Sequence, residues 1–369
     1  MIKFNKFIIM QKSFIINVLC VCLLRSLMAF VDIKSSAYFK VLRRVSSHND
    51  ECRNLQSSQT QKDLHLNEEL SLNIIKQELI VALFSEQQAS SIIAALPDIG
   101  KSRKGFYSRL SQFTFLVQEG VYNPQTAYNF ACDQPNFFDW DLEVVYENDH
   151  YVAINKPFNV RLNNGSKRQK LWDNEVTVSD WLDDNYPEFQ QHHLCHQLDM
   201  ATSGILLIAK RHRAASKAQK LFQKRQVNKT YSALVYGHPS WDELIVNAPI
   251  CRDPNDAFKM KVAEGSEQGK HSETHIQVLK KGHLCCNGNK QEKEEVSLVA
   301  LYPKTGRRHQ LRVHTLSTGH PIVGDATYSL DLTNYRMFLH AEALSLALPI
   351  TVGGDLDIKR KSDFNRFVC

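Results

Sequence analysis

The chain has 369 residues and a mass of 42.3 kDa, enough for two ordinary domains or for one larger domain with an extension. Hydrophobic residues make up 43% and charged residues 23%, with only 15 Gly and 11 Pro, which excludes a collagen-like, low-complexity or wholly disordered protein. Lys and Arg exceed Asp and Glu by 45 to 39, and this net charge of +6 is too small to identify a polyanionic partner. The distribution of the charges is therefore more informative than their sum.

Residues 1–67 are interpreted as an apolar and basic leader followed by a flexible polar linker. There is no carboxylate from Met1 to Val31, and the run from Phe14 to Leu24 is almost entirely apolar. This run is shorter than the roughly 18 to 20 apolar residues of a membrane span, so a membrane role is the weakest interpretation. A secretory signal peptide, a mitochondrial presequence and a non-native upstream extension all stay open. The compartment is accordingly left between mitochondrial and cytoplasmic or nuclear.

The sequence pattern divides the rest of the chain into two regions. From residue 68 to residue 135, apolar residues recur at steps of three and four, which predicts a helical accessory region. From residue 141 onward, short β-branched runs are separated by turns, which predicts a sheet-containing domain over residues 141–369. Within it we expect a strand pair at 144–146 and 151–154, and surface helices at 176–186 and 213–226. Because strands and helices do not alternate regularly, the predicted fold class is α+β rather than a doubly wound parallel sheet.

Two clusters of cysteine and histidine are candidates for a metal site. Cys285 and Cys286 follow His283, but no cysteine pair stands at a C-x-x-C spacing anywhere in the chain. The segment from His192 to His196 carries three histidines and one thiol, but another role for His196 is favoured below. The nine cysteines are odd in number and irregularly spaced, so no disulfide framework is predicted. We expect no metal.

A single carboxylate lies at the start of a strongly basic segment. Asp199 belongs to a loop that leads into Ile205–Ala209, an apolar run of the length of a buried strand. Between Asp199 and Asp242 there is no acidic residue, whereas eight Lys and Arg side chains fall within residues 210–229. The predicted helix 213–226 turns its apolar side chains inward and several of these cations outward. A merely soluble helix face normally mixes both signs, so this pattern favours a nucleic-acid partner.

A second basic run covers residues 302–314. Its four cations are Lys304, Arg307, Arg308 and Arg312. No carboxylate appears from Val296 until Asp325. Nearby positive charge favours the charged form of a carboxylate. Asp199 is therefore a candidate nucleophile or charge stabiliser at neutral pH.

Five stretches carry a resemblance to a known family. They are HQLDMATSGILLIAK (196–210), KTYSALVYGH (229–238), GKHSET (269–274), KTGRRHQLRVHTLSTGHPIVGD (304–325) and LHA (339–341). In this order and spacing the chain resembles the RluA-type family of RNA pseudouridine synthases, from about Val144 to Pro349. The resemblance is specific for the family and not for the substrate. It implies the pseudouridine synthase fold, a mixed and mainly antiparallel sheet with a central active-site cleft, here with an N-terminal helical extension.

The resemblance also implies a reaction. Such enzymes break the C1′–N1 glycosidic bond of a uridine in RNA, rotate the uracil and rejoin it to the ribose through C5. The implied partner is an RNA substrate, whether tRNA, rRNA or mRNA, and no cofactor is implied. The oligomeric state is unknown from the sequence, and a monomer is favoured.

Carried over position by position, the resemblance assigns three catalytic residues. Asp199 would attack the ribose C1′ or assist a glycal-like intermediate, Tyr231 would stack on the target base, and Arg312 would pair with the aspartate. Cleavage of a glycosidic bond develops oxocarbenium character, which an adjacent carboxylate can stabilise or trap. The residues expected to bind substrate are His196, Gln197, Leu198, Thr202, Ser203, Gly204, Lys229, Arg307, His309, Gln310 and Leu339.

One residue departs from the family pattern. Most members have Arg before the Leu-Asp pair, whereas Gln197 stands there in this chain. Gln keeps hydrogen-bonding capacity but loses the cation and the stacking plane of a guanidinium. We expect altered base flipping or substrate choice rather than inactivity. Two alternatives stay open: an RNA-binding module that modifies nothing, and a hydrolase of nucleosides or sugars, for which no second carboxylate is evident beside Asp199.

Overall fold

The computed structural model describes residues 142–163, 175–189, 191–284, 294–331, 334 and 336–369. The predicted leader and linker (1–67), the predicted helical accessory region (68–135) and the pair Cys285–Cys286 lie outside these residues. The domain boundaries, including the start of the sheet-containing domain at 141, therefore stay predictions. In the described part of the chain no helix is long and apolar enough to cross a membrane.

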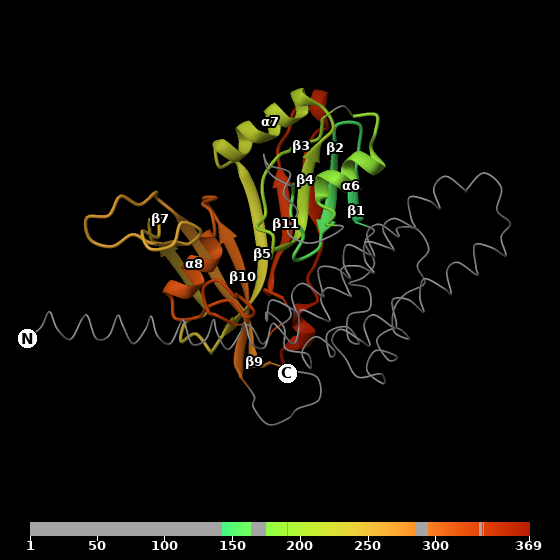
Figure 1. Cartoon of the computed structure of the whole chain (residues 1–369). Helices are drawn as coiled ribbons and strands as arrows, with labels where there is room; N and C mark the ends of the chain where they lie inside the picture. Colours follow the sequence, from blue (N-terminus) through green and yellow to red (C-terminus); the bar gives the residue numbers. More distant parts are fainter. Residues whose placement is uncertain (1–141, 164–174, 190, 285–293, 332–333, 335) are drawn as a thin grey trace, which may run out of the picture. The chain divides into compact units, whose positions relative to one another are not determined.

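A 10-stranded sheet forms the centre of the described structure (Figure 1). Its main path is β1 (Glu143–Glu147), β2 (Tyr151–Lys156), β4 (Ser203–Ala209), β11 (Leu339–Leu346), β5 (Val227–Tyr236), β10 (Glu295–Pro303), β9 (Glu273–His283) and β6 (Glu243–Asn247). Outside this path, β3 (His193–Leu194) pairs with β4 and β12 (Leu356–Lys359) pairs with β11. Among the described pairings of this sheet, β4 with β11 is parallel and the others are antiparallel. The expected mixed, mainly antiparallel sheet is confirmed.

Helices and a small hairpin flank this sheet. They are α6 (Val178–Asn185), α7 (His212–Gln223), α8 (Gln310–Ser317), the 3-10 helices η2 (Ile350–Val352) and η3 (Phe364–Phe367), and the hairpin of β7 (Ile250–Arg252) with β8 (Met260–Val262). The helices predicted at 176–186 and 213–226 are confirmed as α6 and α7. A capping box starts α6, because Thr177 Oγ1 accepts from Asp180 N at 3.3 Å and the Asp180 carboxylate accepts from Thr177 N at 2.8 Å.

Strand β4 is buried along its whole length because helices cover both of its faces. Successive side chains of a strand point to opposite faces. Ile205 and Leu207 belong to the core that includes α7, whereas Leu206 and Ile208 belong to the core that includes α6. The loop that precedes β4, with Asp199, is thereby attached to a rigid element of the structure.

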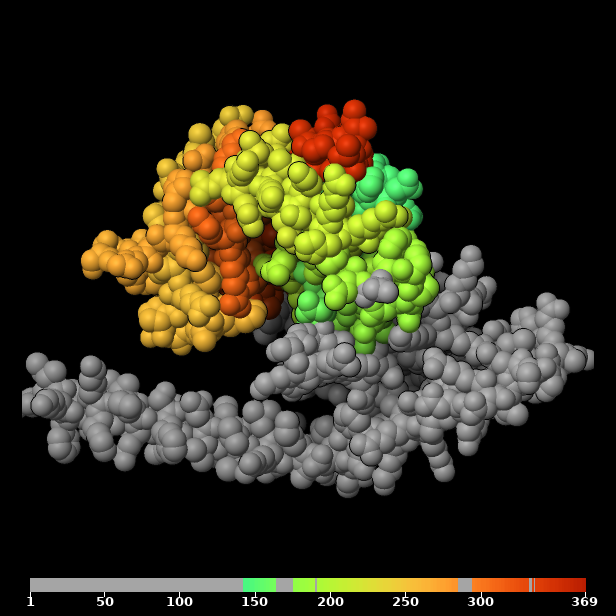
Figure 2. Space-filling model, turned by 90° about the horizontal axis from the view of Figure 1, so that it is seen from above, coloured from blue at the N-terminus to red at the C-terminus, as the bar shows by residue number. Residues whose placement is uncertain are grey.

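The second half of the sheet packs under α8. Val299 and Leu301 of β10 share a core with Leu311 of α8, and Ala233 of β5 belongs to the same core. In Figure 1, β5 lies between the half that carries α7 and the half that carries α8. Seen from above, the molecule is hollowed between the yellow-green half and the gold and orange half (Figure 2). This hollow is where the cavity described below lies.

The C-terminal residues close one side of the sheet. Phe364 is fully buried, and its ring centroid lies 5.3 Å from that of Phe338 in an edge-on contact. Cys369 takes part in a disulfide bond, which the irregular cysteine spacing does not predict. Of the other described cysteines, Cys195 and Cys251 are free.

Candidate active site

A cavity of about 720 Å³ opens between the loop before β4, the end of α7, strand β5 and the segment that joins β10 to α8. All but two of the residues singled out from the sequence line it. They are His196, Gln197, Leu198, Asp199, Thr202, Lys229, Tyr231, Arg307, His309, Gln310, Arg312 and Leu339. Folding therefore brings four distant stretches of the chain to one place, 196–202, 229–231, 307–312 and Leu339.

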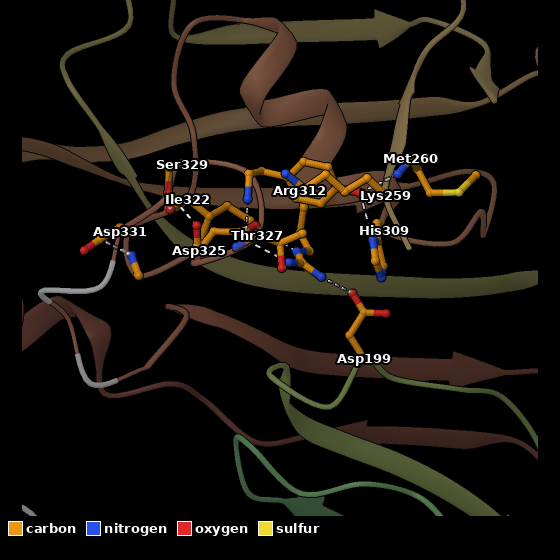
Figure 3. Close-up of polar contacts among 12 residues, drawn as sticks. Asp199, Lys259, Met260, His309, Arg312, Ile322, Asp325, Thr327, Ser329 and Asp331 are labelled. Atoms are coloured by element: carbon orange, nitrogen blue, oxygen red, sulfur yellow. Dashed lines mark hydrogen bonds and ion pairs between the residues drawn. The ribbon is translucent and has the colours of Figure 1, made fainter. Parts of the chain in front are cut away.

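The guanidinium of Arg312 lies between two carboxylates (Figure 3). Its Nη1 donates to Asp199 Oδ2 at 3.2 Å, while Nε and Nη2 donate to the two oxygens of Asp325 at 2.8 and 2.7 Å. The side chains of Asp325 and Arg312 are 1% and 6% exposed, whereas that of Asp199 is 29% exposed. Asp325 therefore fixes Arg312 from within the protein, and Arg312 holds one oxygen of a carboxylate that is open to the cavity.

His309 lies beside this ion pair. Its Nδ1 is 2.7 Å from the hydroxyl of Tyr328, whose oxygen accepts from Met260 N at 2.9 Å. The Tyr328 hydroxyl is therefore assigned as a donor to Nδ1. Neutral His309 then carries its ring proton on Nε2. Burial lowers the pKa of His309 to about 4, against the opposing effect of the Asp199 charge. The Asp199 charge acts on His309, and both residues line the cavity, so a neutral hydrogen-bond donor stands at the cavity wall. Figure 3 labels both residues.

Tyr231 of β5 and Leu339 of β11 form part of the apolar surface of the cavity. Leu339 is 3% exposed, and Tyr231 packs against two separate cores of the protein. Burial raises the pKa of Tyr231, and the negative charge of Asp199 raises it further. The phenol is therefore uncharged at neutral pH, and a flat ring suited to stacking lies near the carboxylate.

His196 anchors the loop that carries Asp199. Its Nε2 accepts from Leu207 N at 3.1 Å, and its ring stacks on Phe222 with centroids 5.0 Å apart. Burial lowers the pKa of His196 to about 4, and the positive charge of Lys229 acts in the same direction. Lys229 donates to the Thr305 carbonyl at 3.2 Å, and burial lowers its pKa to about 8. His196 is thus a neutral structural link between the loop and β4.

Gln310 braces the basic segment on the other side of the cavity. Its Oε1 accepts from Thr305 Oγ1 at 2.7 Å and from Arg307 N at 3.0 Å. Its Nε2 donates to Glu273 O and to Thr274 Oγ1, both at 2.9 Å. Both ends of this amide are bound to protein, so Gln310 shapes the segment that presents Arg307 to the cavity.

Within the ranges that the structure describes, no group of three or more His, Cys, Asp or Glu side chains is placed to hold a metal ion. The nitrogen of His196 that faces β4 is already occupied by the Leu207 amide. His192 lies 3.4 Å from an Asp183 oxygen through Nε2. The histidine run at 192–196 therefore points its rings at different protein partners rather than at one centre.

Comparisons with known proteins agree with this geometry. Residues 150–317 match the family model described as RNA pseudouridylate synthase. RNA pseudouridylate synthase domain-containing protein 1 of Danio rerio is 36% identical over 220 residues, which cover 56% of this chain and 71% of that protein. Dual-specificity RNA pseudouridine synthase RluA of Vibrio parahaemolyticus is 37% identical over 211 residues, which cover 56% of this chain and 78% of that protein. The chain belongs to the RNA pseudouridylate synthase family.

A solved structure supports the same assignment. The structure of human RNA Pseudouridylate Synthase Domain Containing 1 has a TM-score of 0.51 and 32% identity, and covers 61% of this chain and 84% of that chain. The enzyme class expected from the motifs, an isomerase acting on uridine in RNA, is confirmed. Proteins of the domain-containing protein 1 type, one from Danio rerio and one from human, are thus among these relatives.

Two residues expected to contact substrate do not line the cavity. Ser203 is 5% exposed, and its hydroxyl lies 2.8 Å from His340 Nδ1 and accepts from Arg336 Nη2 at 2.6 Å. Gly204 has φ +110°, and a Cβ there would lie 2.3 Å from the Ala341 carbonyl oxygen. Only glycine tolerates this approach of β11 to β4. Both positions hold β4 against its neighbours in the sheet, and their contact with substrate stays a prediction.

Other residues of the site were not singled out from the sequence. Asp325 and Tyr328 fix Arg312 and His309, and Cys195 and Phe222 line the cavity. Asp325 is the last residue of the longest motif stretch, 304–325. Its position in that motif is the sequence feature that could have identified it as a site residue. Tyr328 and Phe222 lie outside the motifs, and their roles depend on contacts that only the folded chain makes.

Proposed function

We propose that Asp199 is the carboxylate with which this enzyme isomerises uridine to pseudouridine, and that Arg312 and Tyr231 complete the catalytic site. The observation that carries the proposal is the single-point contact of Arg312 with a partly exposed carboxylate at the cavity wall. Among the described residues that line the cavity, Asp199 is the one carboxylate. A glycosidase that works with two carboxylates would need a second one nearby.

The chemistry requires a negative charge at the ribose. When the C1′–N1 bond breaks, its electron pair goes to N1 and positive charge develops at C1′, which Asp199 would stabilise or trap. After the uracil rotates, a C5–C1′ bond forms, C5 loses its proton, and N1 gains one. Atoms and electrons balance without an external oxidant or reductant.

Three neighbours would position the nucleotide. The uncharged ring of Tyr231 would stack on the uracil, and Leu339 would close the apolar side of the cavity. The Nε2–H of His309 would donate to an acceptor oxygen of the substrate, because its neutral tautomer is fixed by Tyr328. Electrostatic and hydrogen-bonding groups that are already in place cost little reorganisation during the reaction.

Basic residues around the cavity would hold the RNA backbone. Lys304 and Arg308 are exposed at the segment between β10 and α8, and Lys224 and Arg225 are exposed at the end of α7. Flipping the target uridine out of its stack costs roughly a few kcal/mol, which phosphate contacts can offset. The family model and the RluA relatives are named for RNA without a class of RNA, so tRNA, rRNA and mRNA are all candidate substrates.

The test is pseudouridine mapping of total tRNA, rRNA and mRNA after incubation with wild-type protein and with Asp199→Asn, which preserves shape and removes charge. The matched control is Asp242→Asn, because the Asp242 side chain is 94% exposed. We expect new pseudouridine sites with wild type and Asp242→Asn and none above background with Asp199→Asn. Salt-sensitive RNA binding without any new site in any RNA class would support the binding-module alternative instead.

A further inference from the structure

An exposed aromatic ring stands at the rim of the cavity. Phe258, in the segment between β7 and β8, is 56% exposed, and it is the one exposed ring among the described Phe, Tyr and Trp residues. Its centroid lies 5.3 Å from that of His309, and the guanidinium carbon of Arg308 lies 4.8 Å from the same centroid. Arg308 and His309 both line the cavity. Phe258 is therefore in direct contact with the cavity wall.

The segment that carries Phe258 is held by hydrogen bonds. Phe258 N donates to Asp256 Oδ1 at 2.9 Å, and Asp253 N donates to Lys259 O at 3.1 Å, which closes the loop at its base. Met260 N donates to the Tyr328 hydroxyl at 2.9 Å, and that hydroxyl also contacts His309. The position of Phe258 is thus tied to the residues that fix the site. A preorganised ring loses little conformational freedom on binding.

The residues around the Phe258 ring indicate which kind of ligand it would bind. A single exposed hydrophobic residue is common on protein surfaces and needs no explanation by itself. Here the ring lies against the guanidinium of Arg308, and both Arg308 and Lys304 are exposed cations of the cavity lining. An aromatic face combined with cations is the arrangement that binds single-stranded nucleic acid through stacked bases and phosphates. An apolar protein or lipid surface would not use these charges.

We propose that Phe258, supported by Arg308, is a stacking platform for a base adjacent to the target uridine in the same RNA strand. Removal of the uridine from the stack leaves its neighbour without one stacking partner, and an aromatic ring at the cavity rim replaces that partner. The platform rests on the proposed function, because it needs the cavity to hold a flipped uridine. It would make the enzyme select targets whose neighbouring base is free to stack.

The first experiment pairs a protein change with an RNA change. The probe is a short synthetic stem-loop that carries a mapped uridine, with abasic sites introduced singly at the adjacent positions. In wild type, one abasic position is expected to weaken binding about 5- to 150-fold, the range of base stacking on an aromatic ring. Phe258→Leu should weaken binding of the intact RNA by a similar factor. This variant should bind the abasic RNA that has an effect in wild type as tightly as it binds the intact RNA. Phe258→Tyr should behave like wild type.

A structural role of Phe258 predicts a different result. If the ring merely covers His309, Phe258→Leu would weaken the intact and all abasic RNAs by the same factor, and the two effects would multiply. That outcome, or the absence of any abasic position with an effect in wild type, overturns the platform. In that case, pseudouridine formation by wild-type protein on the same stem-loop would still support the proposed function.

A second experiment does not depend on catalysis. In an Asp199→Ala background, Phe258→Trp should show fluorescence quenching on addition of a mixed-sequence single-stranded RNA, beyond that of the background protein. Ile245→Trp is the matched control, because Ile245 is 65% exposed on the edge strand β6 and does not line the cavity. Quenching at position 258 and not at 245 supports the platform even if Asp199 has no effect on pseudouridine formation. Equal quenching at both positions overturns it.

Discussion

Arg312 holds Asp199 through a single hydrogen bond of 3.2 Å, although the same guanidinium is bound at 2.7 and 2.8 Å by Asp325. The buried carboxylate orients the cation, and the cation in turn orients the exposed carboxylate. Figure 3 shows the second oxygen of Asp199 pointing away from Arg312. Asp199 is therefore positioned without being enclosed, which suits a group that has to meet a ribose.

The first prediction concerns Asp325, which acts through Arg312 rather than on substrate. Asp325→Asn keeps the shape of the side chain but leaves a 6% exposed arginine without its two-point anion contact. Loss of one partner of a buried ion pair typically costs about 3–5 kcal/mol of stability, and an amide that still accepts hydrogen bonds should lower that cost. We expect kcat to fall more than KM rises. Single-turnover kinetics and urea unfolding measure the two effects.

The control for Asp325 is an exposed ion pair. Asp357 and Lys359 lie 2.9 Å apart with side chains 62% and 67% exposed. Because such surface pairs contribute roughly 0–1 kcal/mol, Asp357→Asn should leave both stability and turnover nearly unchanged. Equal effects of the two substitutions would show that the buried pair has no special role.

The second prediction concerns Gln197, which is exposed at the cavity wall where most of the family has Arg. Gln197→Ala should lower kcat/KM about 10-fold, since a hydrogen bond to the RNA or to the displaced base is removed. Gln197→Arg should tighten binding and increase its salt dependence, because it adds a cation. Steady-state kinetics on looped and base-paired forms of one target would measure both. Gln226→Ala, at an exposed position outside the cavity lining, is the control, and full activity of Gln197→Ala would remove any role for the position.

Local patterns predicted the parts of the site that depend on contiguous sequence. The apolar run 205–209 became the buried strand β4, and the one-sided helix 213–226 became α7, because burial and amphipathic period act over a few residues. The family resemblance also predicted that Arg312 pairs with Asp199. The structure places them in contact across 113 positions of sequence separation.

Contacts that depend on the path of the chain in space were not predicted. Ser203 follows Thr202 in the motif, yet it starts β4 and points its hydroxyl to His340 instead of the cavity. Adjacent residues at the start of a strand turn to opposite sides, so membership of a motif does not decide which residue meets the substrate. Phe258 lies in a loop outside every motif, and its position beside Arg308 follows from the packing of the β7–β8 hairpin.

The third prediction concerns the basic face of α7. Lys220 and Lys224 are exposed, and the end of the helix adjoins the cavity. Lys220→Gln combined with Lys224→Gln should reduce the slope of log K against log salt concentration by about 0.7 to 0.9 for each RNA phosphate that these lysines neutralise. RNA binding measured over a range of KCl concentrations gives this slope. Lys359→Gln is the control on another surface, and an unchanged slope in the double variant would exclude α7 from the RNA path.

The fourth prediction is a pH dependence of stability that arises from neutral histidines. His340 is 6% exposed, its Nε2 lies 2.8 Å from the Arg360 carbonyl oxygen, and burial lowers its pKa to about 4 from an ordinary value of 6.5. The unfolded chain therefore takes up this proton first as the pH falls, so the stabilising contribution is complete above pH 6.5 and is lost progressively toward pH 4. The slope is at most about 1.4 kcal/mol per pH unit for each such histidine. Urea unfolding at successive pH values should give a shallower slope for His340→Gln than for wild type. Parallel curves would mean that His340 does not bind its proton differently in the folded and unfolded chain.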